Sequence, residues 1–101
     1  MFITEYLVVF GKLQVLKQID AKTVCDKLLL FIPEALYCSY LNSDGLRIGE
    51  ATRVSIASHE KLTIMVLPFE IEDESLVLAI KNNCNLKEIV TTVKHCFSSF
   101  R

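Results

Sequence analysis

The chain contains no long apolar run, no cluster of basic residues and no cationic leader, and each absence excludes a class of protein. No apolar run is longer than Ile64–Phe69, which is far shorter than the ~20 residues of a membrane-spanning helix, so no membrane span is expected. The 11 basic residues are scattered among 12 acidic ones at a net charge of −1, which gives no electrostatic footprint for nucleic acid. The amino terminus lacks a basic segment and a small-residue cleavage site, so a signal peptide is not expected.

Residues able to support catalysis or bind metal are few and dispersed. The cysteines form no C-x-x-C pair and stand beside apolar residues: Cys25, Cys38, Cys84 and Cys96. This favours reduced, buried thiols in a cytoplasmic protein, with a disulfide framework or a zinc site as the alternative. His59 and His95 are far apart, and the acidic stretch 70–74 lacks the glycine and ligand spacing of a calcium loop. We therefore expect no catalytic, metal or cofactor site and a protein that is not an enzyme.

The second half of the chain has the pattern of consecutive strands. Runs rich in β-forming residues cover Ala51–Ser58, Lys61–Phe69 and Ser75–Lys81. The polar pair His59-Glu60 separates the first two runs at hairpin spacing. The middle run is apolar on both strand faces, which is typical of a strand inside a sheet with both faces covered. Pro68 cannot donate to a ladder, so pairing should stop or bulge there.

The amino-terminal segment indicates a β-hairpin. Ile3–Phe10 and Leu13–Ile19 flank Gly11-Lys12, and glycine permits the positive φ of a hairpin turn. A helix with apolar residues at helical spacing is the alternative, although Gly11 would cost it about 1 kcal/mol.

A helix is predicted to begin after Asp20, whose carboxylate can cap its first turn. Within it, Leu28–Ile32 is apolar nearly all round, so this turn needs a second partner besides its own sheet. Pro33 should kink or end the helix.

For the next residues we prefer a continued helix over Glu34–Leu41 followed by a loop. The alternative is that Leu36–Leu41 pairs with Leu46–Ile48 around Asn42–Gly45, whose Asp-Gly pair is a strong turn signal.

The carboxy-terminal helix is the clearest element in the sequence. Asn85 is a plausible N-cap with Glu88 three residues later, and apolar residues then follow at helical spacing to Phe100. The predicted fold is one α+β sandwich domain over residues 1–101 in the order β-β-α-β-β-β-α. It has a five-stranded antiparallel sheet with a helix on each face.

Two stretches resemble the roadblock family of dynein light chains and GTPase-scaffold subunits. They are the run from Val54 to Val66 and the strand Leu76–Ile80, with the strand, polar turn, Ile-Met-Val strand and Leu-Val-rich strand of that family. The first helix of roadblock proteins has no counterpart here. The related longin fold, also profilin-like, starts directly with the hairpin and is the second resemblance.

The resemblance implies a non-enzymatic dimer whose sheets join through the third strand while the middle helices pair. The all-round apolar turn of the middle helix independently asks for a partner. The dimer interface is therefore predicted at Cys25, Leu28, Leu29, Phe31, Ile32, Thr52, Val54 and Ile56. Because the first roadblock helix is missing, part of the sheet should be open as a partner-binding patch, lined by Tyr6, Val8 and Phe10 or else by Leu7 and Val9.

The function expected from these features is a dimerising scaffold or adaptor that binds or regulates a small GTPase or a motor or trafficking complex. It would pair with itself or a paralogous subunit in the cytoplasm and reach a membrane only through a complex, without a cofactor. The alternatives are a longin-type subunit of a vesicle-trafficking complex and a small-molecule sensor of profilin-like fold.

Overall fold

The computed structural model describes residues 2–3, 20–55, 61–69 and 74–99. In chain order the elements are β1 (Phe2–Ile3), α2 (Ala21–Phe31), β2 (Ala35–Leu41), β3 (Arg47–Thr52), β4 (Leu62–Pro68), β5 (Ser75–Lys81) and α3 (Leu86–Ser99). The strands form one sheet in the order β1-β4-β5-β2-β3. Four of them are antiparallel neighbours, and the two-residue β1 pairs parallel with β4. The α+β class is confirmed, whereas the expected sheet of five antiparallel strands is not what the described residues form.

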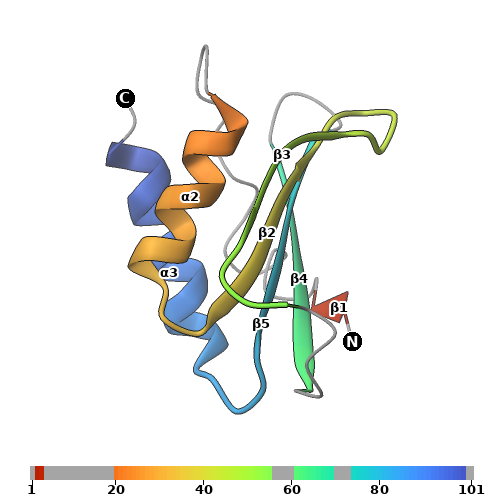
Figure 1. Cartoon of the computed structure of the whole chain (residues 1–101). Coiled ribbons are helices and arrows are strands. Elements are labelled where there is room, and N and C mark those ends of the chain that lie inside the picture. Colours follow the sequence, from red (N-terminus) through yellow and green to blue (C-terminus); the bar gives the residue numbers. More distant parts are fainter. Residues whose placement is uncertain (1, 4–19, 56–60, 70–73, 100–101) are drawn as a thin grey trace.

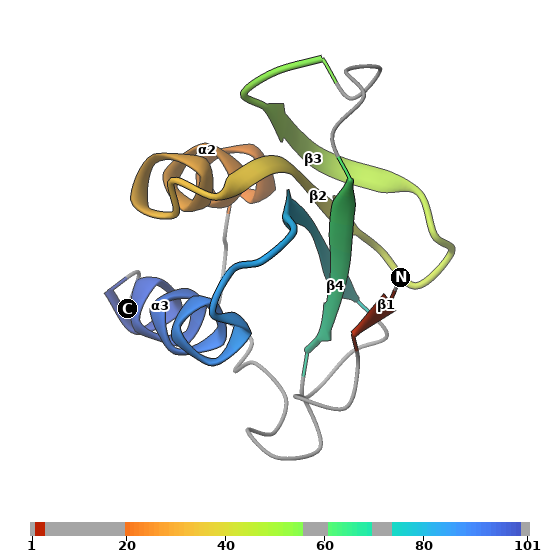
Figure 2. The same cartoon turned by 90° about the horizontal axis from the view of Figure 1, so that it is seen from below.

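Both helices lie on the same face of the sheet, antiparallel to each other (Figures 1 and 2). They contact one another directly, and both contribute to a single buried apolar cluster with the sheet. The prediction of one helix on each face is therefore wrong. The apolar side chains of both helices are buried by the same sheet face, so no second layer is needed to bury them.

The ends of α2 follow the local signals. The Asp20 carboxylate accepts from the Lys22 backbone N–H at 3.1 Å and from the Thr23 hydroxyl at 2.9 Å, which confirms the predicted cap. The helix ends at Phe31, and Ile32 closes it by donating its N–H to the Leu28 carbonyl. Pro33 follows at once and cannot continue the helical ladder.

The segment after Pro33 is a strand, so the preferred helix over Glu34–Leu41 is wrong and the alternative hairpin is right. The Asn42 side chain accepts from the N–H groups of Asp44 and Leu46, and Gly45 has a φ of 78°. This turn joins β2 to β3, and β2 is paired on its other side with β5. Hydrogen bonds to a strand on each side satisfy the backbone N–H and C=O groups of β2. A short helix after a proline would leave more of these groups without a partner.

The expected strand Ala51–Ser58 ends early, because β3 runs from Arg47 to Thr52 and residues 53–55 bend away from the strand. In the described residues, four strands, not the expected three, therefore separate α2 from α3. The expected hairpin of this strand with the next one is wrong, because β3 pairs with β2 and is separated from β4 by β2 and β5. Residues 56–60, with the His59-Glu60 pair, lie outside the described residues, as does the predicted amino-terminal hairpin apart from Ile3.

The expected strands Lys61–Phe69 and Ser75–Lys81 are confirmed as β4 and β5, which pair antiparallel, and Pro68 is the last residue of β4 as expected. Only one face of β4 is fully buried, since burial alternates along the strand and Ile64 and Val66 are half-buried. The expectation that both faces would be covered therefore holds only for the face that meets the helices.

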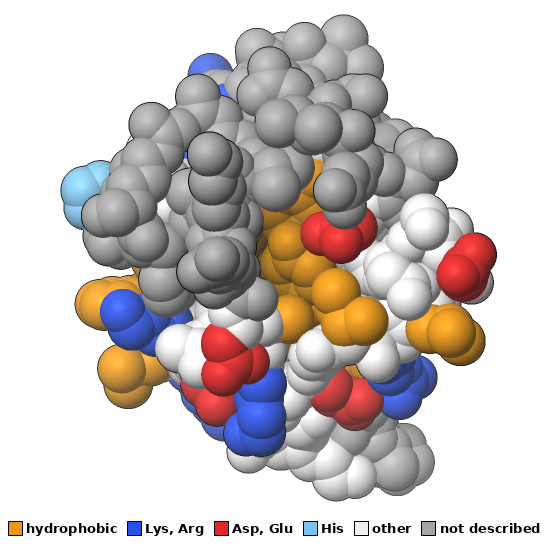
Figure 3. All heavy atoms as spheres, turned by 90° about the horizontal axis from the view of Figure 1, so that it is seen from above, with side chains coloured by type: hydrophobic (Ala, Val, Ile, Leu, Met, Phe, Trp, Pro, Cys, Tyr) orange, Lys and Arg blue, Asp and Glu red, His pale blue; other side chains and the backbone are white. Residues whose placement is uncertain are grey.

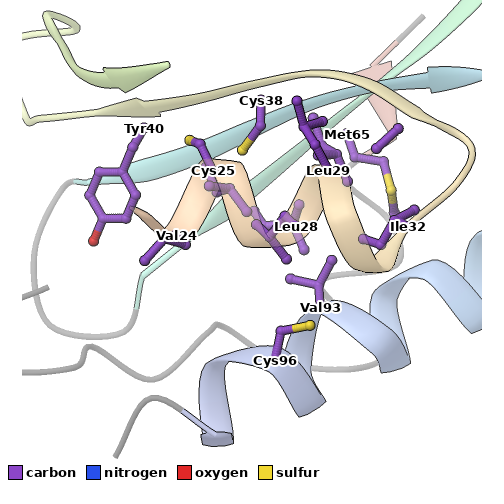
Figure 4. Packing of buried hydrophobic residues seen from close by; sticks show 14 of the residues in the cluster. Val24, Cys25, Leu28, Leu29, Ile32, Cys38, Tyr40, Met65, Val93 and Cys96 are labelled. Carbon is purple, nitrogen blue, oxygen red and sulfur yellow. The ribbon is translucent and has the colours of Figure 1, made fainter. Parts of the chain in front are cut away.

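The core lies between the helices and the sheet (Figure 4). From α3, which the Asn85 side chain caps by accepting from the Glu88 N–H at 3.2 Å, Val90 and Val93 are fully buried. From the sheet, Phe69 stacks on Tyr40 with ring centroids 4.9 Å apart and contacts Phe97 of α3 at 5.4 Å. This ring series joins β2, β4 and α3 into one packing unit.

Candidate interaction surfaces

The described residues bring together no metal-binding set. They contain no group of three or more His, Cys, Asp or Glu side chains that could hold a metal ion. His95 is exposed whereas its neighbour Cys96 is buried, so the two side chains of α3 point apart. None of the helices in the described ranges is long and apolar enough to cross a bilayer.

The cysteines are reduced, and three of them belong to the core. Cys25 of α2 and Cys38 of β2 are fully buried and face each other across the helix–sheet layer (Figure 4). Their mutual hydrogen bond, followed by burial, raises the pKa of the Cys38 thiol. Cys96 is also buried, and burial raises the pKa of its thiol too. Uncharged, enclosed thiols of this kind pack as small apolar groups rather than act as nucleophiles.

The large hydrophobic side chains that remain exposed in the described part of the chain form two groups. Leu30 and Phe31, which are 74% and 55% exposed, end α2. Leu46, Ile48 and Val54, at 64%, 45% and 41%, lie on β3 and its two flanks. We call Leu30 and Phe31 the α2 tip, and Leu46, Ile48 and Val54 the β3 edge. Seen from above the view of Figure 1, hydrophobic side chains also gather in the centre of the molecule's upper face, with acidic side chains beside them (Figure 3).

The α2 tip borders a small hollow formed with the first turns of α3. Its wall includes Phe31, Glu34, Asn85, Glu88, Ile89 and Thr92, and its volume is about 100 Å³. The turn beneath it is held by Arg53. One guanidinium nitrogen of Arg53 donates to the carbonyls of Ile32, Pro33 and Ala35 at 3.1, 2.7 and 2.8 Å. This clamp presents the α2 tip on a fixed turn rather than on a free loop.

The β3 edge is the end of the sheet, and no described strand pairs with its outer side. A register shift between Tyr40 and Leu41 of β2 leaves Ile48 as an extra residue on β3. Because of this bulge, Arg47 and Glu50 come to the same face of the sheet, where they form an ion pair at 3.0 Å. The regular edge available to a further strand is therefore Gly49–Thr52.

The structure separates the residues predicted for the dimer interface. Cys25, Leu28, Leu29 and Ile32 are buried in the chain's own core and so are not on its surface. Phe31, Thr52 and Val54 are exposed. Ile56 and the predicted patch of Tyr6, Val8 and Phe10 lie outside the described residues.

The sequence interpretation did not single out Leu30, Leu46 or Ile48. Leu30 was part of the apolar turn of α2, and its helical position opposite Cys25 and Leu28 was the signal that could have identified it. For Leu46 and Ile48 the signal was the Asp-Gly turn, since accepting it would have placed them on the outer strand of a hairpin.

Compared with family models, with curated proteins and with solved structures, the chain has no match in any of the three comparisons.

Proposed function

We propose that the protein is a non-catalytic scaffold or adaptor that dimerises and binds a small GTPase or a subunit of a motor or trafficking complex in the cytoplasm. The proposal is carried by the placement of the exposed large hydrophobic side chains in two groups, the α2 tip and the β3 edge. Adjacent exposed apolar side chains such as Leu30 and Phe31 are typical of contact surfaces. The class of partner is taken from the resemblance of the Val54–Val66 and Leu76–Ile80 stretches to roadblock proteins.

The β3 edge is the proposed contact with a second copy or a paralogous subunit. An unpaired strand edge offers a row of N–H and C=O groups that another strand can bond. Over the regular edge Gly49–Thr52, two identical strands can pair antiparallel about a two-fold axis between Glu50 and Ala51. The bulge at Ile48 limits the paired length, so the side chains of Ile48 and Val54 must add apolar contact.

The α2 tip is the proposed contact with the functional partner. Leu30 and Phe31 are adjacent, exposed and supported by the Arg53 clamp. An aromatic and an aliphatic side chain on a rigid support are the kind of anchor that supplies most of the energy of an interface. Val54 follows Arg53 and so lies beside the turn that carries the α2 tip, whereas Leu46 and Ile48 lie toward the other end of β3.

Light scattering on the purified chain tests the dimer. We expect a mass of at least twice 11.5 kDa at micromolar concentration. Ile48→Lys and Thr52→Lys should each give a folded monomer, because a lysine on an edge strand opposes pairing with another chain. Leu30→Lys is the matched control: it adds the same charge away from β3 and should leave the mass unchanged. A wild-type chain that stays monomeric under these conditions contradicts the dimer.

A further inference from the structure

The hollow beside the α2 tip has the size of one side chain rather than of a metabolite. Its volume of about 100 Å³ is well below the roughly 300–1,000 Å³ of small-molecule sites. It lies where the end of α2 meets the start of α3, which are neighbours in both views of the fold (Figures 1 and 2). A partner that binds the α2 tip can therefore insert a single residue here.

The charges in the wall of this hollow are all negative. Glu34, next to the start of β2, and Glu88 of α3 both line it, and no lysine or arginine does. Neither carboxylate takes part in the ion pairs of the described residues. The basic residue Arg53 holds the turn beneath the hollow. The guanidinium nitrogen that reaches this turn already donates to three carbonyls.

The apolar part of the wall suits a long aliphatic stem. Phe31, which is more than half exposed, and Ile89 line it together with Ile32, so the wall has apolar side chains beside its two carboxylates. Arginine and lysine side chains are complementary to such a wall, because each has an apolar stem that ends in a cation. The Phe31 ring offers the cation a further contact through its π face.

We propose that the hollow receives a lysine or arginine side chain of the partner protein, with its stem against Phe31 and Ile89 and its charge between Glu34 and Glu88. This inference rests on the proposed function, because it names the chemistry of the partner that binds the α2 tip. It specifies a basic residue flanked by apolar residues, since Leu30 and Phe31 form the adjoining surface.

The test is selection of binders from a random twelve-residue peptide library on the full chain, followed by fluorescence anisotropy with the enriched peptides. We expect enrichment of a basic residue beside apolar ones. Replacing that residue by an uncharged isostere, citrulline for arginine or norleucine for lysine, should weaken binding about tenfold. The double variant Glu34→Gln/Glu88→Gln should weaken the original peptide to a similar extent and be insensitive to the isostere, as expected for one shared interaction.

The control Asp26→Asn/Asp44→Asn removes two exposed carboxylates outside the hollow and should leave binding unchanged within about twofold. If binders depend on Leu30 and Phe31 but carry no basic residue, or bind the double glutamine variant normally, this inference is overturned while the proposed function stands. If no enriched peptide depends on Leu30 or Phe31, both are overturned.

Discussion

At the scale of single residues, Cys84 is the one cysteine in the described part of the chain that is not fully buried. Its thiol lies 2.8 Å from the Lys81 carbonyl, and burial, followed by the charge of Glu34, raises its pKa. We therefore predict that iodoacetamide modifies Cys84 first, but more slowly than a cysteine in an unstructured peptide at the same pH. Glu34→Gln should speed this reaction because it lowers the thiol pKa again. Peptide mass spectrometry measures the rates, with Glu50→Gln as the control, and an unchanged rate in Glu34→Gln contradicts the argument.

Arg53 gives a second prediction at this scale. Its guanidinium donates to three carbonyls at the α2–β2 turn, and its own N–H donates to the Leu36 carbonyl at 2.9 Å. Arg53→Met removes the side-chain bonds while keeping the stem, and we expect a loss of about 1–2 kcal/mol in the free energy of unfolding. Arg53→Lys should recover only part of it, because an ammonium group cannot copy the planar fork of the guanidinium. Urea unfolding measures both, and full stability of Arg53→Met would show that the clamp is dispensable.

At the scale of elements, Gly49 allows α2 to lie directly on β3. A Cβ at this position would come within 2.6 Å of the Ala21 backbone carbon and 2.7 Å of the Lys22 nitrogen. Because these are backbone atoms, the first turn of α2 would have to move. We predict that Gly49→Ala lowers the free energy of unfolding by about 1–3 kcal/mol, as overpacking does.

Gly45 provides the comparison for this prediction. It has open space around its Cα but a positive φ of 78°, so its requirement is conformational and not steric. Asparagine tolerates that φ better than other residues with a side chain, and Gly45→Asn should therefore be milder than Gly49→Ala. The opposite order in urea unfolding would mean that α2 does not rest on β3 as described.

At the scale of the whole molecule, one buried cluster connects both helices with the sheet. Phe97 is central to this connection, since it joins α3 to Phe69 and, through that ring, to Tyr40. A single core predicts a single unfolding transition, with the tyrosine signal in near-UV circular dichroism and the far-UV helix signal changing together. Phe97→Ala should lower both midpoints equally and cost about 3–5 kcal/mol. Separate midpoints would indicate that α3 is an independent unit.

The sequence by itself determined the elements whose signals are local. Asp20 and Asn85 mark the starts of α2 and α3, and Pro33 marks the end of α2, because caps and proline act on backbone groups within one turn. The strands β4 and β5 were equally readable as β-rich runs, but their pairing partners were not, since the hairpin predicted around His59-Glu60 does not form.

Only the tertiary structure decided the identity of β2, the side of the sheet on which each helix lies and the residues left on the surface. Glu34–Leu41 has no strong local preference, and its strand form depends on bonds to β5, whose residues lie about forty positions along the chain. In the same way, Leu28–Ile32 is uniformly apolar, so its sequence could not separate Leu29, which the sheet buries, from Leu30, which stays exposed. The α2 tip and its acidic hollow exist because α3 packs against the end of α2, a contact between residues distant in sequence that no local pattern encodes.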